Sequence, residues 1–294
     1  MTAVETFEAH RPMMLALAYR MLGDLGRAED VVQDAWMRWE GRAEEVDAPK
    51  AFLLKVVTRL CLNEMDSARA RREESRGDRL PEPIDLGDGA IGRVEVVDQI
   101  SMAFLVVLQR LTPAERATLL LHDVFDLDHA EIAALLGKSE AACRQLLSRA
   151  REHVAEEKRA MQTSADEHRR LLRAFVEASS EGDQKRMIEL LADDATLVVD
   201  AGPSERRVGR IRNLGRPVCG ARRIAAFLGA VARETEVSGS FREHELNGQA
   251  AIVRLVAGRP EAALFVSVAD GKIRHVFVQA DIARLSRVGV GPLA

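Results

Sequence analysis

Apolar residues recur every three to four positions through the first seventy residues, and apart from Pro12 the Gly and Pro residues occur there only at breaks. This period is typical of amphipathic helices that share one core. It predicts helices over residues 5–22, 26–41 and 48–72. Residues 76–93 follow, rich in Gly, Pro and charge and without a period, which is typical of a linker. We therefore expect a first all-α domain over residues 1–75.

Helical signals resume over residues 94–160, where two capping signals mark helix starts. Thr112 and Asp128 each stand three residues before a Glu, which is the arrangement of a capping box. The text after the second box predicts a short helix over 128–136, a turn at Gly137 and a helix that runs from a Ser139 cap to about residue 159. A second all-α domain that ends in a helical hairpin is therefore expected.

The pattern changes near residue 164. Two helices and a strand fit the text up to Asp200, and another helix fits 219–233. Three alternating apolar segments follow, AIVRLV, EAALFVSVAD and GKIRHVFVQ, with turns expected at Gly258-Arg259-Pro260 and at Asp270-Gly271. Helices followed by an antiparallel meander predict an α+β domain over residues 164–294. The expected fold class is thus multidomain, with two all-α domains before one α+β domain.

Composition narrows the class of protein. The 294 residues are 47% hydrophobic, which suffices for ordinary cores, and no apolar run approaches the roughly 20 residues of a membrane helix. The first twenty residues do not have the layout of a secretory signal. The three cysteines lie far apart, which argues against a disulfide framework or a zinc site. A cytoplasmic chain without membrane spans, metal or cofactor is expected.

The overall charge argues against a nucleic-acid partner, but its distribution does not. There are 42 Lys and Arg against 46 Asp and Glu, a net charge of -4, whereas nucleic-acid-binding domains are often strongly basic. Up to residue 160 the chain has 22 basic and 29 acidic residues, and after it 20 basic and 17 acidic. Because the two parts differ in sign, local charge has to be considered for each segment.

The second helix of the predicted hairpin is rich in arginine. Residues 143–151 hold three arginines and no acid, and small residues fall on the inner side of the hairpin. The side chains expected to face outward are Arg144, Gln145, Ser148, Arg149 and Arg151. Such a helix fits a DNA major groove, where arginine can reach phosphates or guanine and glutamine can reach adenine. An ordinary surface hairpin with solvated arginines is an equal alternative on this feature alone.

Two other segments carry charge patterns that are weaker signals. Residues 24–47 hold eight acids and three arginines, a helix that DNA would repel and that suits a basic groove on a protein. A merely solvated helix face is the favoured alternative from composition. The helix predicted over 48–72 has a basic flank that acidic residues interrupt, so phosphate binding by it is weakly indicated.

Together the three segments resemble the extracytoplasmic-function (ECF) sigma factors of the sigma-70 superfamily. The text that carries the resemblance is AEDVVQDAWMRW, KAFLLKVVTRLCLNEMDSARARRE and LTPAERATLLLHDVFDLDHAEIAALLGKSEAACRQLLSRARE. In that family the first domain binds core RNA polymerase and melts the -10 promoter element, and the second reads the -35 element of promoter DNA. Two departures occur, Leu146 where a basic residue is common, and Asn63-Glu64-Met65-Asp66 where arginine is more frequent.

The resemblance implies a role for each matching residue. The residues that match the core-binding helix are Asp30, Gln33 and Asp34. Those that match the promoter-melting helix are Asn63, Arg69, Arg71 and Arg72. Those that match the -35 recognition helix are Arg144, Gln145, Ser148, Arg149 and Arg151. The expected function is promoter-specific transcription initiation with core RNA polymerase, and no enzymatic chemistry is expected.

The last domain resembles the SnoaL-like cone, which the SigJ-like subgroup of ECF sigma factors carries after the -35 domain. Leu80-Pro81-Glu82-Pro83 matches the linker motif of that subgroup. Asp200-Ala201-Gly202-Pro203-Ser204 stands where Asp-Gly-Gly-Gly-Lys is expected, and Gln279-Ala280-Asp281 where Asn-Pro-Asp is expected. In the subgroup these segments are associated with intramolecular contacts that tune activity. Regulatory roles are therefore implied for Pro81, Glu82, Pro83, Asp200 and Asp281, and a separate anti-sigma factor is not required.

Two rival hypotheses remain at this stage. A plain helix-turn-helix repressor or activator would bind promoter DNA tightly without polymerase. Alternatively the cone could be an enzyme, with Asp200, His244 and His275 as its polar candidates, although no spacing pairs them as acid and base. The segment 206–223 holds seven arginines and no acid, which fits either contact with an acidic partner or a solvated hairpin.

Overall fold

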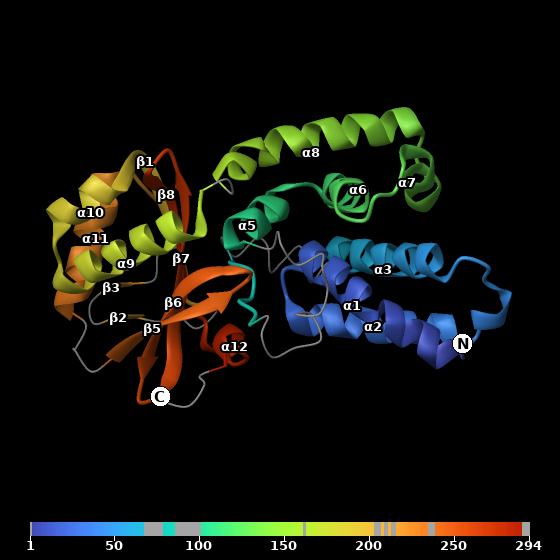
Figure 1. Cartoon of the computed structure of the whole chain (residues 1–294), viewed down its shortest axis with the longest axis horizontal. Helices are drawn as coiled ribbons and strands as arrows, with labels where there is room; N and C mark the ends of the chain where they lie inside the picture. The colour runs from blue at the N-terminus through green and yellow to red at the C-terminus, as the bar shows by residue number, and fades with distance from the viewer. Residues whose placement is uncertain are drawn as a thin grey trace. The chain divides into compact units, whose positions relative to one another are not determined.

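The computed structural model describes residues 2–67, 79–85, 101–160, 163–202, 207–208, 211–212, 216–234 and 239–289. The chain divides into two compact units (Figure 1). Unit 1 comprises residues 1–75, 89–100 and 104–155, and unit 2 comprises residues 76–88, 101–103 and 156–294. Helical segments precede an α+β domain, so the predicted fold class is confirmed. Among the described residues, no helix is both long and apolar enough to cross a membrane.

The first part of unit 1 contains α1 (Ala3–Leu22), α2 (Leu25–Glu40), the short 3₁₀ helix η1 (Ala43–Glu45) and α3 (Pro49–Asp66). Thr2 and Glu5 form a capping box before α1, and Gly23 ends that helix in the left-handed conformation. Asp24 then caps α2. The three predicted helices are confirmed, although the predicted end of the third, at residue 72, lies outside the described residues.

The second part of unit 1 is formed mostly by α5 (Met102–Arg110), α6 (Pro113–Asp123), α7 (His129–Leu136) and α8 (Glu140–Ala160), of which residues 102–103 and 156–160 belong to unit 2. Both predicted capping boxes are confirmed. Thr112 accepts from the Glu115 amide and Asp128 from the Glu131 amide, while each glutamate accepts from the backbone N–H of its capping residue. These boxes fix where α6 and α7 begin, and thereby where the hairpin of α7 and α8 starts.

A buried arginine joins the two parts of unit 1. The guanidinium of Arg116 on α6 is 4% exposed, and its Nη1 donates to the carbonyl of Met21 near the end of α1. Its Nη2 donates to the carbonyl of Leu111 at 3.5 Å. Carbonyls in the last turn of a helix lack partners within that helix, so a buried donor that reaches one satisfies both groups.

Unit 2 contains α9 (Ala165–Glu181), α10 (Gln184–Leu190), α11 (Ala221–Glu234) and α12 (Ile282–Leu285). Its main sheet contains β1 (Leu191–Asp200), β4 (Val218–Cys219), β5 (Gly239–Leu246), β6 (Gln249–Val256), β7 (Arg259–Ala269) and β8 (Lys272–Gln279). Strand order in the described part is β4-β1-β8-β7-β6-β5, with β1 parallel to β8 and the other pairs antiparallel. A separate pair, β2 (Arg207–Val208) and β3 (Ile211–Arg212), lies in the arginine-rich segment.

The predicted meander is confirmed, with two corrections. Strand β5, GSFREHEL, was not predicted, and it adds an edge to the sheet. The turn predicted at Gly258-Arg259-Pro260 is wrong by one residue, because positive φ angles fall at Ala257 and Gly258 and Arg259 already begins β7. Asn247-Gly248 and Asp270-Gly271 have the same paired positive φ angles, which two-residue hairpins require.

The two faces of the main sheet are covered differently. Helices α9, α10 and α11 pack on one face around a core that includes Phe175, Ile224 and Val266 (Figure 1). Residues 79–85 and α12 belong to the other side, where Leu80 and Ile84 are buried. A segment from the predicted linker is therefore part of the fold of unit 2.

Candidate nucleic-acid interface and the anchored linker

Helix α8 is held against α6 and α7 by small and apolar side chains. Gly137 ends α7 with a φ of 65°, and the Ser139 hydroxyl accepts from the Ala142 amide at the start of α8. The residues of α8 that are at most 3% exposed are Cys143, Leu147, Ala150 and Val154. Burial raises the pKa of the Cys143 thiol, so this side chain stays neutral in the core. The turn and the packing together define one outer face of α8.

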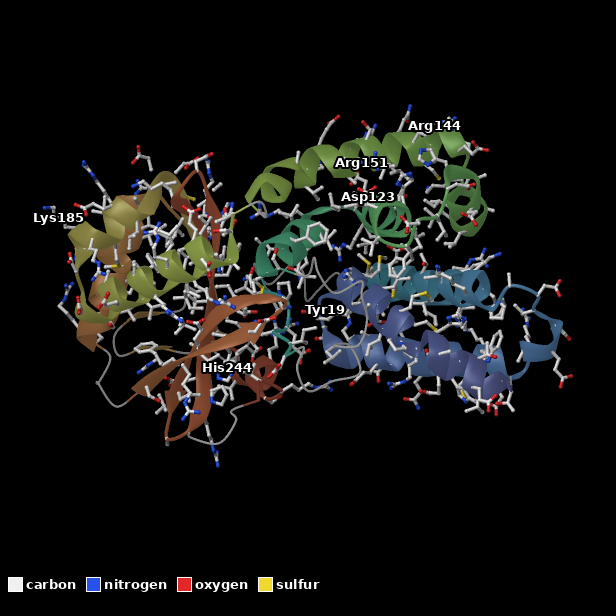
Figure 2. The ribbon with its side chains drawn as sticks, in the orientation of Figure 1. Tyr19, Asp123, Arg144, Arg151, Lys185 and His244 are labelled. Atoms are coloured by element: carbon white, nitrogen blue, oxygen red, sulfur yellow. The ribbon has the colours of Figure 1, made fainter. Side chains whose placement is uncertain are left out.

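All five residues predicted to read the -35 element are exposed on α8: Arg144, Gln145, Ser148, Arg149 and Arg151. Their contacts differ. Arg144 pairs with Glu140 at 3.3 Å, and both side chains are more than half exposed, so this pair contributes little. Arg151 instead reaches Asp123 on α6, with Nη2 at 2.5 Å from Oδ1 (Figure 2). That hydrogen bond raises the pKa of Arg151.

Helix α2 has an apolar face and an exposed face on opposite sides. Ala28, Val31, Ala35 and Trp39 are among its buried residues, and the Trp39 Nε1 donates to the carbonyl of Ala3 at 2.8 Å. The exposed side chains include Asp30, Gln33, Asp34 and Met37, the last of them 69% exposed. These four recur at helical spacing and form what we call the α2 face. The three predicted core-binding residues therefore share one exposed surface.

The end of α3 combines one exposed candidate with residues that hold the helix. Asn63 is exposed. Glu64 pairs with Arg27 on α2 at 3.0 Å, and Met65 is buried. Two of the four residues that depart from the family pattern thus contribute to packing. The predicted -10 residues Arg69, Arg71 and Arg72 lie outside the described residues.

The segment 79–85 is anchored on unit 2 through the carboxylate of Asp200. This side chain at the end of β1 is buried, and its Oδ2 accepts from the Leu80 amide at 2.9 Å. The Leu80 carbonyl in turn accepts from Arg284 at 2.7 Å and from Gln279 at 3.4 Å. Both polar groups of the Leu80 backbone are therefore satisfied, which permits the burial of the segment.

Arg79 and Asp281 form a second anchor beside the first. Arg79 Nη2 donates to Asp281 Oδ2 at 2.5 Å, and Arg79 Nε lies 3.7 Å from Asp200. Gly202 has a φ of 76°, and a Cβ there would lie 2.7 Å from Asp281 Cγ, so a larger residue would displace this carboxylate. The motif that begins at Asp200 therefore keeps the aspartate that accepts from Leu80 and the glycine that leaves room for the Asp281 carboxylate.

The rest of the segment is buried in the same way. Pro81, Glu82 and Pro83 are buried, and Glu82 lies 3.9 Å from Arg287. Ile84 exchanges two hydrogen bonds with Asn247, at 3.2 and 2.9 Å. All five predicted regulatory residues therefore lie in the buried contact between the segment 79–85 and the rest of unit 2. Sequence reasoning missed Arg79, although its place directly before Leu80-Pro81 was a usable signal.

The candidate residues of an enzyme in the cone do not meet. His275 shares a 2.6 Å hydrogen bond with Thr196, and Asp200 is occupied by the linker. Asp200 pairs with Gln279 across the sheet, and His275 lies four residues before Gln279 on β8. His275 and Asp200 are therefore separated by about 13 Å along the strand direction. His244 is on β5, about 14 Å from β8 at three strand spacings. The described residues contain no group of side chains arranged to hold a metal ion.

Family models match two parts of the chain, both mainly in unit 1. The model described as Sigma-70 region 2 matches residues 6–72, which include the α2 face and the end of α3. The model described as Sigma-70, region 4 matches residues 101–154, which include the helical hairpin.

Relatives from Mycobacterium tuberculosis match along most of the chain. The probable ECF RNA polymerase sigma factor SigI is 33% identical over 283 residues, which are 93% of this chain and 92% of that protein. The ECF RNA polymerase sigma factor SigJ is 37% identical over 235 residues, 78% of this chain and 73% of that protein. The crystal structure of SigJ matches at a TM-score of 0.73 and 29% identity, over 99% of this chain and all of that one. The chain therefore belongs to the extracytoplasmic-function sigma factors of the sigma-70 family.

Proposed function

We propose that this sigma factor binds core RNA polymerase through the α2 face and directs it to promoters whose -35 element is read by α8. Promoter-specific transcription initiation follows from the family. The residue roles rest on one observation, the opposite charge of two exposed faces in unit 1. The α2 face presents Asp30 and Asp34, which DNA would repel, while residues 143–151 of α8 present only basic charge.

The charge reversal Asp34→Arg is expected to lower the affinity for core RNA polymerase at least about tenfold, because an acidic contact becomes a repulsive one. The measurement is titration of the full-length chain with purified core polymerase. Glu181→Arg, the same change at the exposed end of α9, is the matched control and should bind as the unchanged chain does. Equal affinity for both variants would contradict the role of the α2 face.

We propose further that unit 2 modulates the sigma segments within the same chain, so that a separate anti-sigma factor is not required. Its support is that residues 80–84, which follow the region 2 match, are buried on the sheet of unit 2. Breaking the contacts of Asp200 and Asp281 with this segment would then free the connection between region 2 and region 4 from unit 2. We assign no catalysis to the cone, because its polar candidates are held apart on the sheet. The site of action is the cytoplasm, where the polymerase is.

A further inference from the structure

Arg151 and Asp123 form a two-point contact between α8 and the end of α6. Arg151 Nη2 lies 2.5 Å from Asp123 Oδ1, and Nε lies 3.3 Å from Oδ2. His122 adds a third group, since its Nδ1 lies 3.0 Å from Asp123 Oδ1 and 3.3 Å from Arg151 Nη2. Figure 2 shows the two labelled side chains facing each other between the helices. A bidentate guanidinium–carboxylate pair fixes direction as well as distance.

The position of Arg151 around the axis of α8 is close to that of Arg144, seven residues earlier, and differs from those of Gln145, Ser148 and Arg149. An α-helix turns about 100° per residue, so Gln145 and Arg149 lie opposite the buried stripe formed by Cys143, Leu147 and Ala150. Arg151 lies at about 70° from the centre of the buried stripe, on the flank that faces α6. Its side chain is therefore directed toward the protein rather than along the outward normal.

We infer that Arg151 is a positioning residue, which with Asp123 fixes the rotation of α8 about its axis and so sets which side chains meet the -35 element. This inference rests on the proposed role of α8. The acidic partner supports it, because an unpaired aspartate beside a DNA-binding helix would only weaken binding. The buried stripe of Cys143, Leu147, Ala150 and Val154 packs α8 into the hairpin, and the Arg151–Asp123 pair adds a contact on one flank of that stripe, where it opposes rotation of the helix.

The first test separates positioning from a phosphate contact by salt dependence. Holoenzyme carrying Arg151→Ala should lose about two- to fivefold in discrimination between intact and altered -35 elements, the range expected for an exposed ion pair. Its slope of log affinity against log salt should stay unchanged, whereas a lost phosphate contact would lower the slope by about 0.9. Arg151→Lys should behave like Arg151→Ala, because lysine keeps the positive charge but cannot make the bidentate contact with the Asp123 carboxylate.

The second test uses the sign of the effect at the acid. Asp123→Asn should also lower discrimination about two- to fivefold, although removing a negative charge would otherwise strengthen DNA binding. Glu152→Gln is the matched control, since it removes an exposed acid from α8 itself and leaves the Arg151–Asp123 contact in place, and it should keep full discrimination. Tighter binding with intact discrimination in Asp123→Asn, or a lower salt slope in Arg151→Ala, would overturn the inference.

A third measurement does not depend on promoter reading. In thermal unfolding of the full chain, Asp123→Ala and Arg151→Ala combined should lower Tm no more than the more damaging single change does, because both remove one contact. Additive losses would show that the two residues act separately and would refute the inference. If the unchanged holoenzyme has no -35 preference, the proposed role of α8 fails, while this measurement still decides whether the contact exists.

Discussion

Asp200→Ala is expected to release residues 79–85 from unit 2 and to lower the free energy of unfolding of that unit by about 1–3 kcal/mol. The carboxylate accepts from the Leu80 amide and from Gly202, and it lies beside Arg79. Its removal leaves the buried Leu80 amide without an acceptor, which costs more than the lost contact itself, while Arg79 keeps its pair with Asp281. Hydrogen exchange of the Leu80 amide and denaturant unfolding of the full chain measure the two effects.

Asp194→Ala is the matched control for this prediction. It removes the same side chain from the same strand, but Asp194 is 77% exposed and its 3.6 Å pair with Arg274 is on the surface. Its effect should stay within about 0.5 kcal/mol. Unchanged exchange at Leu80 in Asp200→Ala would contradict the anchor. If exchange at Leu80 rises in Asp200→Ala but its transcription from the promoter equals that of Asp194→Ala, the proposed modulation by unit 2 is wrong. The contact between Asp200 and the Leu80 amide would still be supported.

Arg149→Ala is expected to weaken promoter recognition by about 1–3 kcal/mol and to relax the preference at one base pair of the -35 element. Arg149 is exposed on the outer face of α8, and no ion pair of the described residues engages it. A bidentate contact to guanine is specific to one position, so its loss should not weaken all promoters equally. Run-off transcription on promoters altered one base pair at a time measures this preference.

The control for Arg149 is another exposed arginine remote from α8. Arg170→Ala on α9 removes a side chain that is 67% exposed, with its nearest acid, Glu167, at 3.9 Å. Transcription by this variant should match that of the unchanged chain on every promoter. An identical base preference in Arg149→Ala and the unchanged chain would contradict base reading, and a uniform loss would assign Arg149 to a phosphate.

Local signals in the sequence were enough to predict most helices. Thr112 with Glu115 and Asp128 with Glu131 specify helix starts within four residues, so no distant contact is needed. Strand β5 was missed because GSFREHEL is mostly polar and has little apolar alternation, and it is stabilised by pairing with β6 at the sheet edge. Its following turn, Asn247-Gly248, was the available signal.

The site residues divide in the same way. The exposed face of α8 follows from helical period and was predicted from it, whereas Asp30, Gln33 and Asp34 on α2 came from the family resemblance. Arg79 with Asp281, 202 residues apart, and Arg151 with Asp123, 28 residues apart, depend on which elements the fold brings together. No spacing in one sequence encodes such pairs. The resemblance supplied Asp200 and Asp281, but not the arginine that they hold.

The anchored segment also orders events during synthesis. Leu80 leaves the ribosome about 120 residues before Asp200 and about 200 before Arg284, the groups that hold its backbone. Contacts so distant in sequence form late, because the chain between them must first be made and closed into a loop. The nascent sigma segments therefore exist for a time with Leu80 and Ile84 uncovered. The proposed modulation by unit 2 could begin only when β8 and α12 have been translated, so a prematurely terminated chain would carry the segments that match sigma-70 regions 2 and 4 without it.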